Sequence, residues 1–344
     1  MGKKLLNDVV IIRPLAIFLL VVWHSFIIYT GGWTQPENFK SIETYWWIAK
    51  GSYACMLELF VFISGYVFAL GLEKKNPTLK NVLTSKFKRL IIPSIIFSLA
   101  YYVIFYDIHN FSISSFAIKI LSGCGHMWFL PMLFWTTIFV YLIDKISLPE
   151  HLKLIGCFAL PVLSFLPIPF GLSTAFYYIP FFYLGIYVYR KREDILSKIS
   201  KSLIIKLLIG GGTTFCLGSL AIRDLLPQYI ETGSIIVKGC SLIVGKYIQI
   251  IYALFGIAFI YMFVNYFTYL KNITIPKWII ELNATCFGIY LFQQFILQIL
   301  YYKTSLPTIV GPYWLPWIGL AITLVTSYIL TKLSLKTKLG RQLM

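Results

Sequence analysis

Three ionisable side chains interrupt long apolar stretches of the sequence, namely Arg13, His24 and Glu58. Ionisable groups inside a membrane-embedded segment are costly and usually functional. A histidine exchanges protons near neutral pH, and a neighbouring carboxylate orients its ring and stabilises its protonated form. These residue types therefore indicate acid–base or nucleophilic chemistry within the hydrophobic part of the protein.

Arg13 and His24 are separated by eleven positions in the segment RPLAIFLLVVWH. In a helix this spacing is three turns plus about 20°, so both side chains share one face, about 16 Å apart along the axis. The arrangement suits a long ligand with an anionic head at Arg13 and a reactive end at His24. Each residue also has a structural alternative. Arg13 would then be an ordinary anchor at the inner membrane boundary, and His24 a packed, hydrogen-bonded histidine.

Glu58 and His126 are the other candidates for a catalytic role. Glu58 lies about 9 Å below the outer end of its predicted helix and His24 about 8 Å below the outer end of its own, so we expect matching depths. A buried structural acid is the alternative for Glu58. His126 begins a further apolar segment in GCGHMWFLP and is expected at the outer side, either as a third functional group or as an exposed interfacial histidine.

Polar residues recur on one face of the segment 279–301. Asn283, Tyr290, Gln294 and Gln298 are spaced by seven, four and four positions. This face is expected to point into the helix bundle, where it forms interhelical hydrogen bonds or lines a substrate cavity. We select Tyr290 and Gln294 as cavity-lining candidates.

Two further candidates have an equally plain structural explanation. Ser64 precedes Gly65 in FISGY, and small residues also allow close helix packing. Trp128 is one of several tryptophans near the predicted outer boundary, where an aromatic belt is the ordinary explanation and a sugar-stacking platform the functional one. The others are Trp33, Trp46, Trp47, Trp314 and Trp317.

Composition identifies the elements that must hold these residues. Hydrophobic residues make up 58% of the 344-residue chain and charged residues only 12%, against roughly a quarter charged in soluble domains. A spanning helix needs about 20 mostly apolar residues, and such windows recur. We predict an all-α polytopic membrane helix bundle of about ten transmembrane helices, near 9–29, 52–72, 90–106, 125–143, 152–169, 172–189, 203–222, 247–264, 279–301 and 314–332.

The net charge of +17 is explained by orientation in the membrane and not by nucleic acid. With the N-terminus inside, 23 of the 30 basic residues fall on the inner side, including Lys3 and Lys4. Lys and Arg collect on the cytoplasmic side of membrane proteins. Both termini are therefore predicted to be cytoplasmic, in a multi-pass protein of the plasma (inner) membrane.

The loops are too short for a separate catalytic domain, so residues 1–344 are predicted to form a single membrane domain. The longest inner loop, 73–90, reads as a basic surface segment, and outer loops are expected at 30–51, 107–124, 223–246 and 302–313. The cysteines show no metal-ligand spacing, so no metal site is expected. Cys124 and Cys240 both fall in outer segments, where a bridge between them is an open possibility.

Taken together, these segments resemble the membrane acyltransferase family 3, which includes bacterial polysaccharide O-acetyltransferases. The resemblance rests on Arg13 followed by His24, on LELFVFISGY with Glu58 at an acidic position, on KFKRLIIP, and on NATCFGIYLFQQF. HMWFLP also looks like a family segment. Where the family has a histidine in the fourth segment this chain has Gln293, so no acid–base role is carried to that position.

The resemblance implies a cytoplasmic acyl-CoA donor, used as a co-substrate without a permanently bound cofactor, and an acceptor hydroxyl on a glycan or glycolipid. Arg13, Lys86 and Arg89 would bind the coenzyme A phosphates. His24 would act as a general base or carry the acyl group, assisted by Glu58 or His126. Acetyl is the favoured acyl group and succinyl an alternative. The resemblance leaves two questions open. Transfer is either direct or through an acyl-histidine relay, and the protein is either a monomer or a homodimer.

The competing hypothesis is a transporter or flippase for a glycan or a lipid-linked sugar, which would also suit ten helices and an internal polar stripe. Inverted repeats and paired broken helices, the usual marks of a transporter, are not evident in the sequence. A polysaccharide polymerase is a weaker third hypothesis, because no long outer loop is present.

Overall fold

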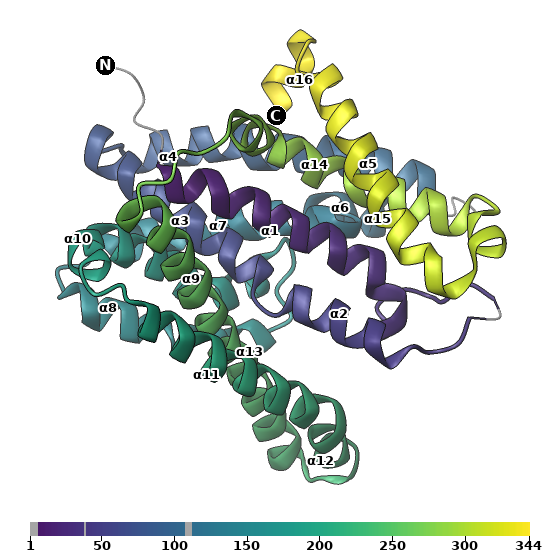
Figure 1. Ribbon diagram of the computed structural model, residues 1–344, viewed down its shortest axis with the longest axis horizontal. Coiled ribbons are helices and arrows are strands. Elements are labelled where there is room, and N and C mark those ends of the chain that lie inside the picture. Colours follow the sequence, from purple (N-terminus) through teal and green to yellow (C-terminus); the bar gives the residue numbers. More distant parts are fainter. Residues whose placement is uncertain (1–5, 38, 107–111) are drawn as a thin grey trace. The chain divides into compact units, whose positions relative to one another are not determined.

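The computed structural model describes residues 6–37, 39–106 and 112–344, and every element in these ranges is a helix (Figure 1). The all-α prediction is therefore confirmed. Lys3, Lys4 and part of the predicted loop 107–124 lie outside the described residues. The chain forms two compact units. Unit 1 comprises residues 1–60, 191–284 and 311–316, and unit 2 comprises residues 61–190, 285–310 and 317–344.

Eight helical stretches in the described residues are long and apolar enough to cross a membrane. This establishes a multi-pass membrane protein, since lipid requires every backbone polar group to be satisfied within the segment. The eight stretches are Asn7–Thr30, Glu43–Lys75, Leu79–Phe105, Gly125–Asp144, Lys201–Thr232, Ile235–Leu270, Lys277–Tyr302 and Leu306–Ser334.

The two predicted spans that have no counterpart among these eight are 152–169 and 172–189. The first consists of two short helices, α8 (Glu150–Cys157) and the 3-10 helix η4 (Leu160–Phe165). Two prolines explain the break, because Pro161 donates no backbone hydrogen bond and Pro167 follows the end of η4. The second is a single helix, α9 (Leu172–Arg190), whose five tyrosines lower its hydropathy.

Unit 1 holds the first helix of the chain and the long pair α11 and α13. The backbones of this pair approach closely because α11 presents glycines to α13: a side chain at Gly211 would meet Phe255, and one at Gly218 would meet Ile248. The helices of unit 1 are α1 (Asn7–Phe26), η1 (Ile27–Thr30), α2 (Glu43–Tyr53), α10 (Arg192–Leu196), α11 (Lys201–Leu220), η5 (Ala221–Leu225), α12 (Leu226–Thr232), α13 (Ile235–Asn265) and η6 (Tyr266–Leu270).

Polar contacts identify the two ends of unit 1. At the start of α1, the fully buried Asp8 lies 3.6 Å from Arg192 of α10. At the far end of α1, the Tyr45 hydroxyl of α2 donates a 2.8 Å hydrogen bond to the carbonyl of Tyr313, and the Tyr29 hydroxyl donates to that of Pro312. The distribution of basic residues predicts that Arg192 lies on the inner side, as does the start of α1. The contact between Asp8 and Arg192 joins these two segments at one end of unit 1, in agreement with the predicted orientation.

Unit 2 is centred on α7 and α9, with α3 packed against α9. A side chain at Gly65 would overlap the carbonyl of Phe182, and one at Gly185 would overlap that of Phe62. Gly65 of FISGY therefore serves helix packing, and a cavity-lining role for Ser64 stays a prediction. The helices wholly in unit 2 are α4 (Leu79–Lys86), η2 (Phe87–Ile91), α5 (Ile92–Phe105), α6 (Ile113–Ser122), η3 (Gly125–Trp128), α7 (Phe129–Asp144), α8, η4, α9 and α16 (Lys338–Leu343).

Three long helices pass from one unit to the other along the chain. They are α3 (Met56–Lys75), α14 (Lys277–Tyr302) and α15 (Leu306–Ser334). In α15 the helix is interrupted at Gly311, which has φ 68°. Within unit 2, α14 and α15 pack closely, since a side chain at Gly288 would overlap Thr331.

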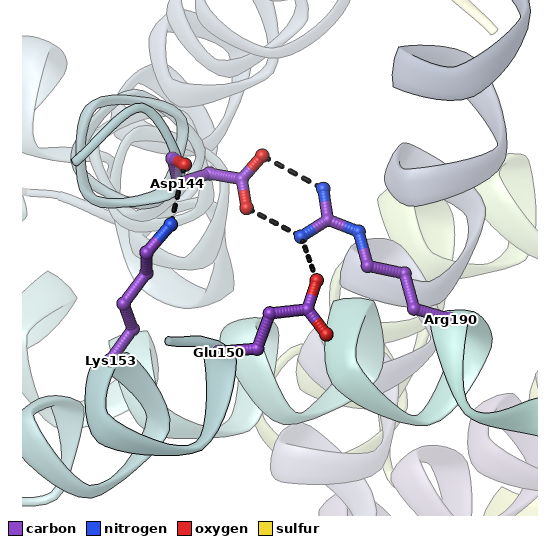
Figure 2. A network of polar contacts seen from close by, with 4 residues as sticks. All are labelled: Asp144, Glu150, Lys153 and Arg190. Atoms are coloured by element: carbon purple, nitrogen blue, oxygen red, sulfur yellow. Dashed lines mark hydrogen bonds and ion pairs between the residues drawn. The ribbon is translucent and has the colours of Figure 1, made fainter. Parts of the chain in front are cut away.

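A polar network ties the ends of α7, α8 and α9 together (Figure 2). The Arg190 guanidinium donates to both carboxylate oxygens of Asp144 at 2.7 and 2.9 Å and to Glu150 at 2.8 Å, while Lys153 donates to the Asp144 carbonyl at 2.8 Å. The hydrogen bonds that Arg190 donates to Asp144 raise the pKa of Arg190 above its usual range. The three helix ends are therefore held on one side of unit 2 by bidentate charge-assisted bonds.

The end of α3 and the residues that follow it, 73–77, lie at the same end of unit 2 as this network. The Tyr189 hydroxyl donates to Glu73 at 2.7 Å, and the Tyr141 hydroxyl donates to the Pro77 carbonyl at 2.9 Å. All of these segments belong to the set that the charge distribution places inside. At the opposite ends of α7 and α9, the Phe170 amide donates to Ser122 at 3.2 Å, which joins two segments predicted to lie outside.

Candidate active site

His24 is buried near the end of α1, with 8% of its surface exposed. The helix runs without interruption from Asn7 to Phe26 and contains Arg13, which is half-buried. The eleven-residue spacing therefore lies within one continuous helix, and both side chains leave the same face of α1.

Trp33 stacks on the imidazole of His24, with ring centroids 5.7 Å apart and planes inclined by 16°. The chain can return to His24 because Gly31, at the end of η1, adopts φ 77° in the left-handed region. The contact therefore fixes the plane of the imidazole ring. The sequence interpretation assigned Trp33 only to the outer boundary, although the Gly31–Gly32 pair directly after the first apolar segment signals a reversal of the chain.

Glu58 is buried near the start of α3, with 6% of its surface exposed. Within unit 1 its carboxyl group interacts electrostatically with Tyr53, Cys55 and Tyr252. The end of α2 and the middle of α13 thus both approach this carboxyl group. The pairing of Glu58 with His24 stays a prediction.

His126 is buried, with 5% exposed, so the alternative of an exposed interfacial histidine is wrong. Its Nε2 atom lies 3.2 Å from the carbonyl oxygen of Leu291, and the Tyr290 hydroxyl donates a 2.6 Å hydrogen bond to the backbone carbonyl of His126. With its proton on Nε2, the ring donates to Leu291 and Nδ1 carries the lone pair. This places a potential proton acceptor in the interior of unit 2.

Glycine conformation brings η3 against α14 and α5. Gly123 and Gly125 have φ values of 88° and 56°, and a side chain at Gly125 would collide with the Tyr101 ring. The backbone amide of Cys124 donates to Ser98 at 3.0 Å. Cys124 is a buried free thiol. The bridge between Cys124 and Cys240 stays an open possibility.

Tyr290 and Gln294 are both buried and lie on the same face of α14, as the stripe predicted. The Gln294 amide nitrogen lies 3.4 Å from the Tyr101 hydroxyl of α5 and donates to it. The stripe therefore makes interhelical hydrogen bonds in unit 2, while a cavity-lining role remains a prediction. Asn283 belongs to the part of α14 in unit 1.

The remaining candidates lie in unit 2. Lys86 ends α4, is half-buried, and holds its ammonium group 5.3 Å from the centroid of the Phe68 ring. Arg89 is exposed in the π-helical turn η2. Ser64 and Trp128 are half-buried, and the Trp128 ring centroid lies 6.4 Å from that of Tyr178.

Trp46 of α2 contacts two cations. The Arg223 guanidinium lies 4.7 Å and the Lys50 ammonium 5.7 Å from its ring centroid, and Arg223 also bonds Glu43 at 2.6 Å. Cation–π contacts thus provide a structural role for Trp46, which weakens its case as a sugar-stacking platform.

A family model described as an acyltransferase domain, of type 3, matches residues 7–332. The chain belongs to the acyltransferase 3 family. No curated protein and no solved structure gives a match. The acyltransferase 3 match includes every residue selected above, from Arg13 to Gln294, and nearly all of the membrane-spanning helices. Together with those helices, it identifies this acyltransferase 3 protein as a membrane O-acyltransferase.

Proposed function

We propose that this protein transfers an acyl group, acetyl by preference, from cytoplasmic acyl-CoA to a hydroxyl of a cell-surface glycan or glycolipid. The observation that carries the proposal is the face of α1, where the buried His24 lies eleven residues from Arg13 and stacks on Trp33. The plasma (inner) membrane is the proposed location, because the donor is cytoplasmic and the acceptor is external.

The donor would meet Arg13 first. Guanidinium groups bind phosphates through paired, charge-assisted hydrogen bonds, and Arg13 lies one half-membrane away from His24 on the same face. The phosphates of coenzyme A would bind at Arg13, with Lys86 and Arg89 as further donor-binding residues. The acyl-pantetheine arm would follow the apolar face of α1 toward His24.

At His24 the neutral imidazole would take the proton of the acceptor hydroxyl as its oxygen attacks the thioester carbonyl. Collapse of the tetrahedral intermediate breaks the carbon–sulfur bond, and the proton passes to the departing thiolate of coenzyme A. An acyl-histidine relay is the variant in which His24 attacks first. Glu58 and His126 are the groups proposed to orient the imidazole or to stabilise developing charge.

Membranes containing wild-type protein or the His24→Ala variant, incubated with radiolabelled acetyl-CoA, test this proposal. Wild-type membranes should place label on saccharide, and His24→Ala should lose activity by about 10²–10⁴-fold, the usual contribution of a general base. Equal membrane content of the two proteins, measured by immunoblot, excludes failed insertion. Normal labelling in His24→Ala would refute the mechanism, and saccharide export that persists without acyl-CoA would support the transporter hypothesis.

A further inference from the structure

Gln293 of α14 is completely buried, and neither its amide nitrogen nor its amide oxygen has a hydrogen-bond partner among the described residues. The amide oxygen of the adjacent Gln294 is also buried without a partner in that set. Buried polar groups are nearly always hydrogen-bonded in folded proteins, because an unpaired amide loses its bonds to water. Three such atoms on two consecutive side chains indicate a bound partner that the described residues do not supply.

Helix geometry places these atoms on the polar face of α14. Gln293 follows Tyr290 by three positions, so the two side chains lie one turn apart on the same side of the helix. Tyr290 is held by the His126 carbonyl, and the Gln294 nitrogen is held by Tyr101. Because its nitrogen is engaged, the Gln294 side chain has a set orientation that leaves its oxygen to accept a bond.

The unsatisfied atoms define the chemistry of the partner. The Gln293 nitrogen donates, while the Gln293 and Gln294 oxygens accept. A carboxylate or a phosphate offers only acceptors and would leave the two oxygens unpaired, and an ammonium offers only donors. Adjacent hydroxyl groups supply both, since one hydroxyl accepts from the amide nitrogen while its neighbour donates to an amide oxygen. Neighbouring hydroxyls of this kind are the defining feature of a sugar ring.

We infer that Gln293, with the Gln294 oxygen, forms a subsite in unit 2 for the vicinal hydroxyls of an uncharged sugar ring of the acceptor. This inference rests on the proposed function and assigns a specificity-determining role to Gln293. His126, whose backbone holds the neighbouring Tyr290, lies at the same face of α14. The subsite is therefore built next to a buried histidine.

The test uses full-length protein in membranes that contain their own saccharide, with radiolabelled acetyl-CoA as the probe. Gln293→Met keeps the length of the side chain and removes the amide. Ser327→Ala is the matched control, because it removes a buried hydroxyl that is already bonded to the Thr323 carbonyl at 2.6 Å. The readouts are label in the saccharide fraction, the KM for acetyl-CoA, and the membrane content of each variant.

Loss of the amide should lower saccharide labelling about ten- to hundred-fold, as expected for two lost hydrogen bonds, with an unchanged KM for acetyl-CoA. Ser327→Ala should label saccharide as wild type does. Unchanged labelling in Gln293→Met would overturn the subsite and leave buried water as the partner, and a raised KM for acetyl-CoA would assign the amide to the donor.

Two further results complete the test. If Gln293→Met does not accumulate in membranes, Gln293→Glu replaces it, since it keeps the shape and one oxygen but loses both N–H donors. It should again reduce saccharide labelling selectively, and full activity would overturn the inference. Wild-type membranes that place no label on saccharide would refute the proposed function itself. Labelling that is equal in wild type and Gln293→Met would refute only the subsite.

Discussion

At the scale of single residues, backbone carbonyls hold the polar groups of unit 2 in place. Tyr290 donates to the carbonyl of His126, and the His126 ring contacts the carbonyl of Leu291, so α14 and η3 are joined in both directions. Loss of such a bond in an apolar interior lowers the stability of the fold, because the remaining buried carbonyl finds no other donor.

Tyr290→Phe should therefore destabilise the protein by about 1–3 kcal/mol, since it leaves the His126 carbonyl buried without its donor. Thermal unfolding of the detergent-solubilised protein measures the change. If His126 takes part in the transfer, acylation should fall together with stability. Tyr313→Phe is the control, as the Tyr313 side chain is 65% exposed. Equal unfolding temperatures for Tyr290→Phe and wild type would contradict the importance of this bond.

At the scale of elements, the contact of α3 with α9 depends on two glycines. Gly65 and Gly185 each face a backbone carbonyl of the opposite helix, and a Cβ atom at either position would overlap it. A backbone cannot move aside as a flexible side chain can. The close approach of these helices therefore requires glycine at both positions.

Gly65→Val or Gly185→Val should push the two helices apart. Overpacking typically costs about 1–3 kcal/mol, and we expect unit 2 to lose at least that much stability. The expected result is a reduced yield of monodisperse protein in size-exclusion chromatography and a lower unfolding temperature. Gly71→Ala, on the same helix α3 but with open space around its Cβ position, should behave as wild type. Normal yield from both valine variants would show that the helices separate without cost.

At the scale of the whole molecule, orientation in the membrane follows from charge and agrees with the contacts inside each unit. The polar network of Asp144, Glu150 and Arg190 gathers segments that are all predicted to be cytoplasmic (Figure 2). In unit 1, the contact between Asp8 and Arg192 likewise joins two segments that are both predicted to be cytoplasmic.

Cysteine labelling checks this orientation in a background without native cysteines. Lys145→Cys and Lys75→Cys should react with a membrane-impermeant maleimide only after the membrane is opened, because both positions are predicted to be inside. Thr44→Cys and Lys303→Cys should react in intact cells. Labelling of Lys145→Cys from outside would invert the topology and remove the basis for a cytoplasmic donor.

Most of the helices could be predicted from sequence because a spanning segment is specified by its own composition. The segment 9–29 and the helix α1 with η1 agree closely, as do 203–222 and α11. A continuous helix over 152–169 is wrong, because the prolines divide this apolar segment into α8 and η4, while its place as a membrane span stays a prediction. Hydropathy measures affinity for lipid, and it does not report backbone continuity.

The sequence by itself determined the membrane class, the likeness to a family, and the shared face of Arg13 and His24, because each depends on residues close together in the chain. Only the tertiary structure decided that Trp33 stacks on His24, that His126 is buried, and that Gln293 lacks a partner among the described residues. Tyr290 and the carbonyl it bonds are 164 positions apart. Contacts of that kind depend on helix packing, and no local pattern specifies them.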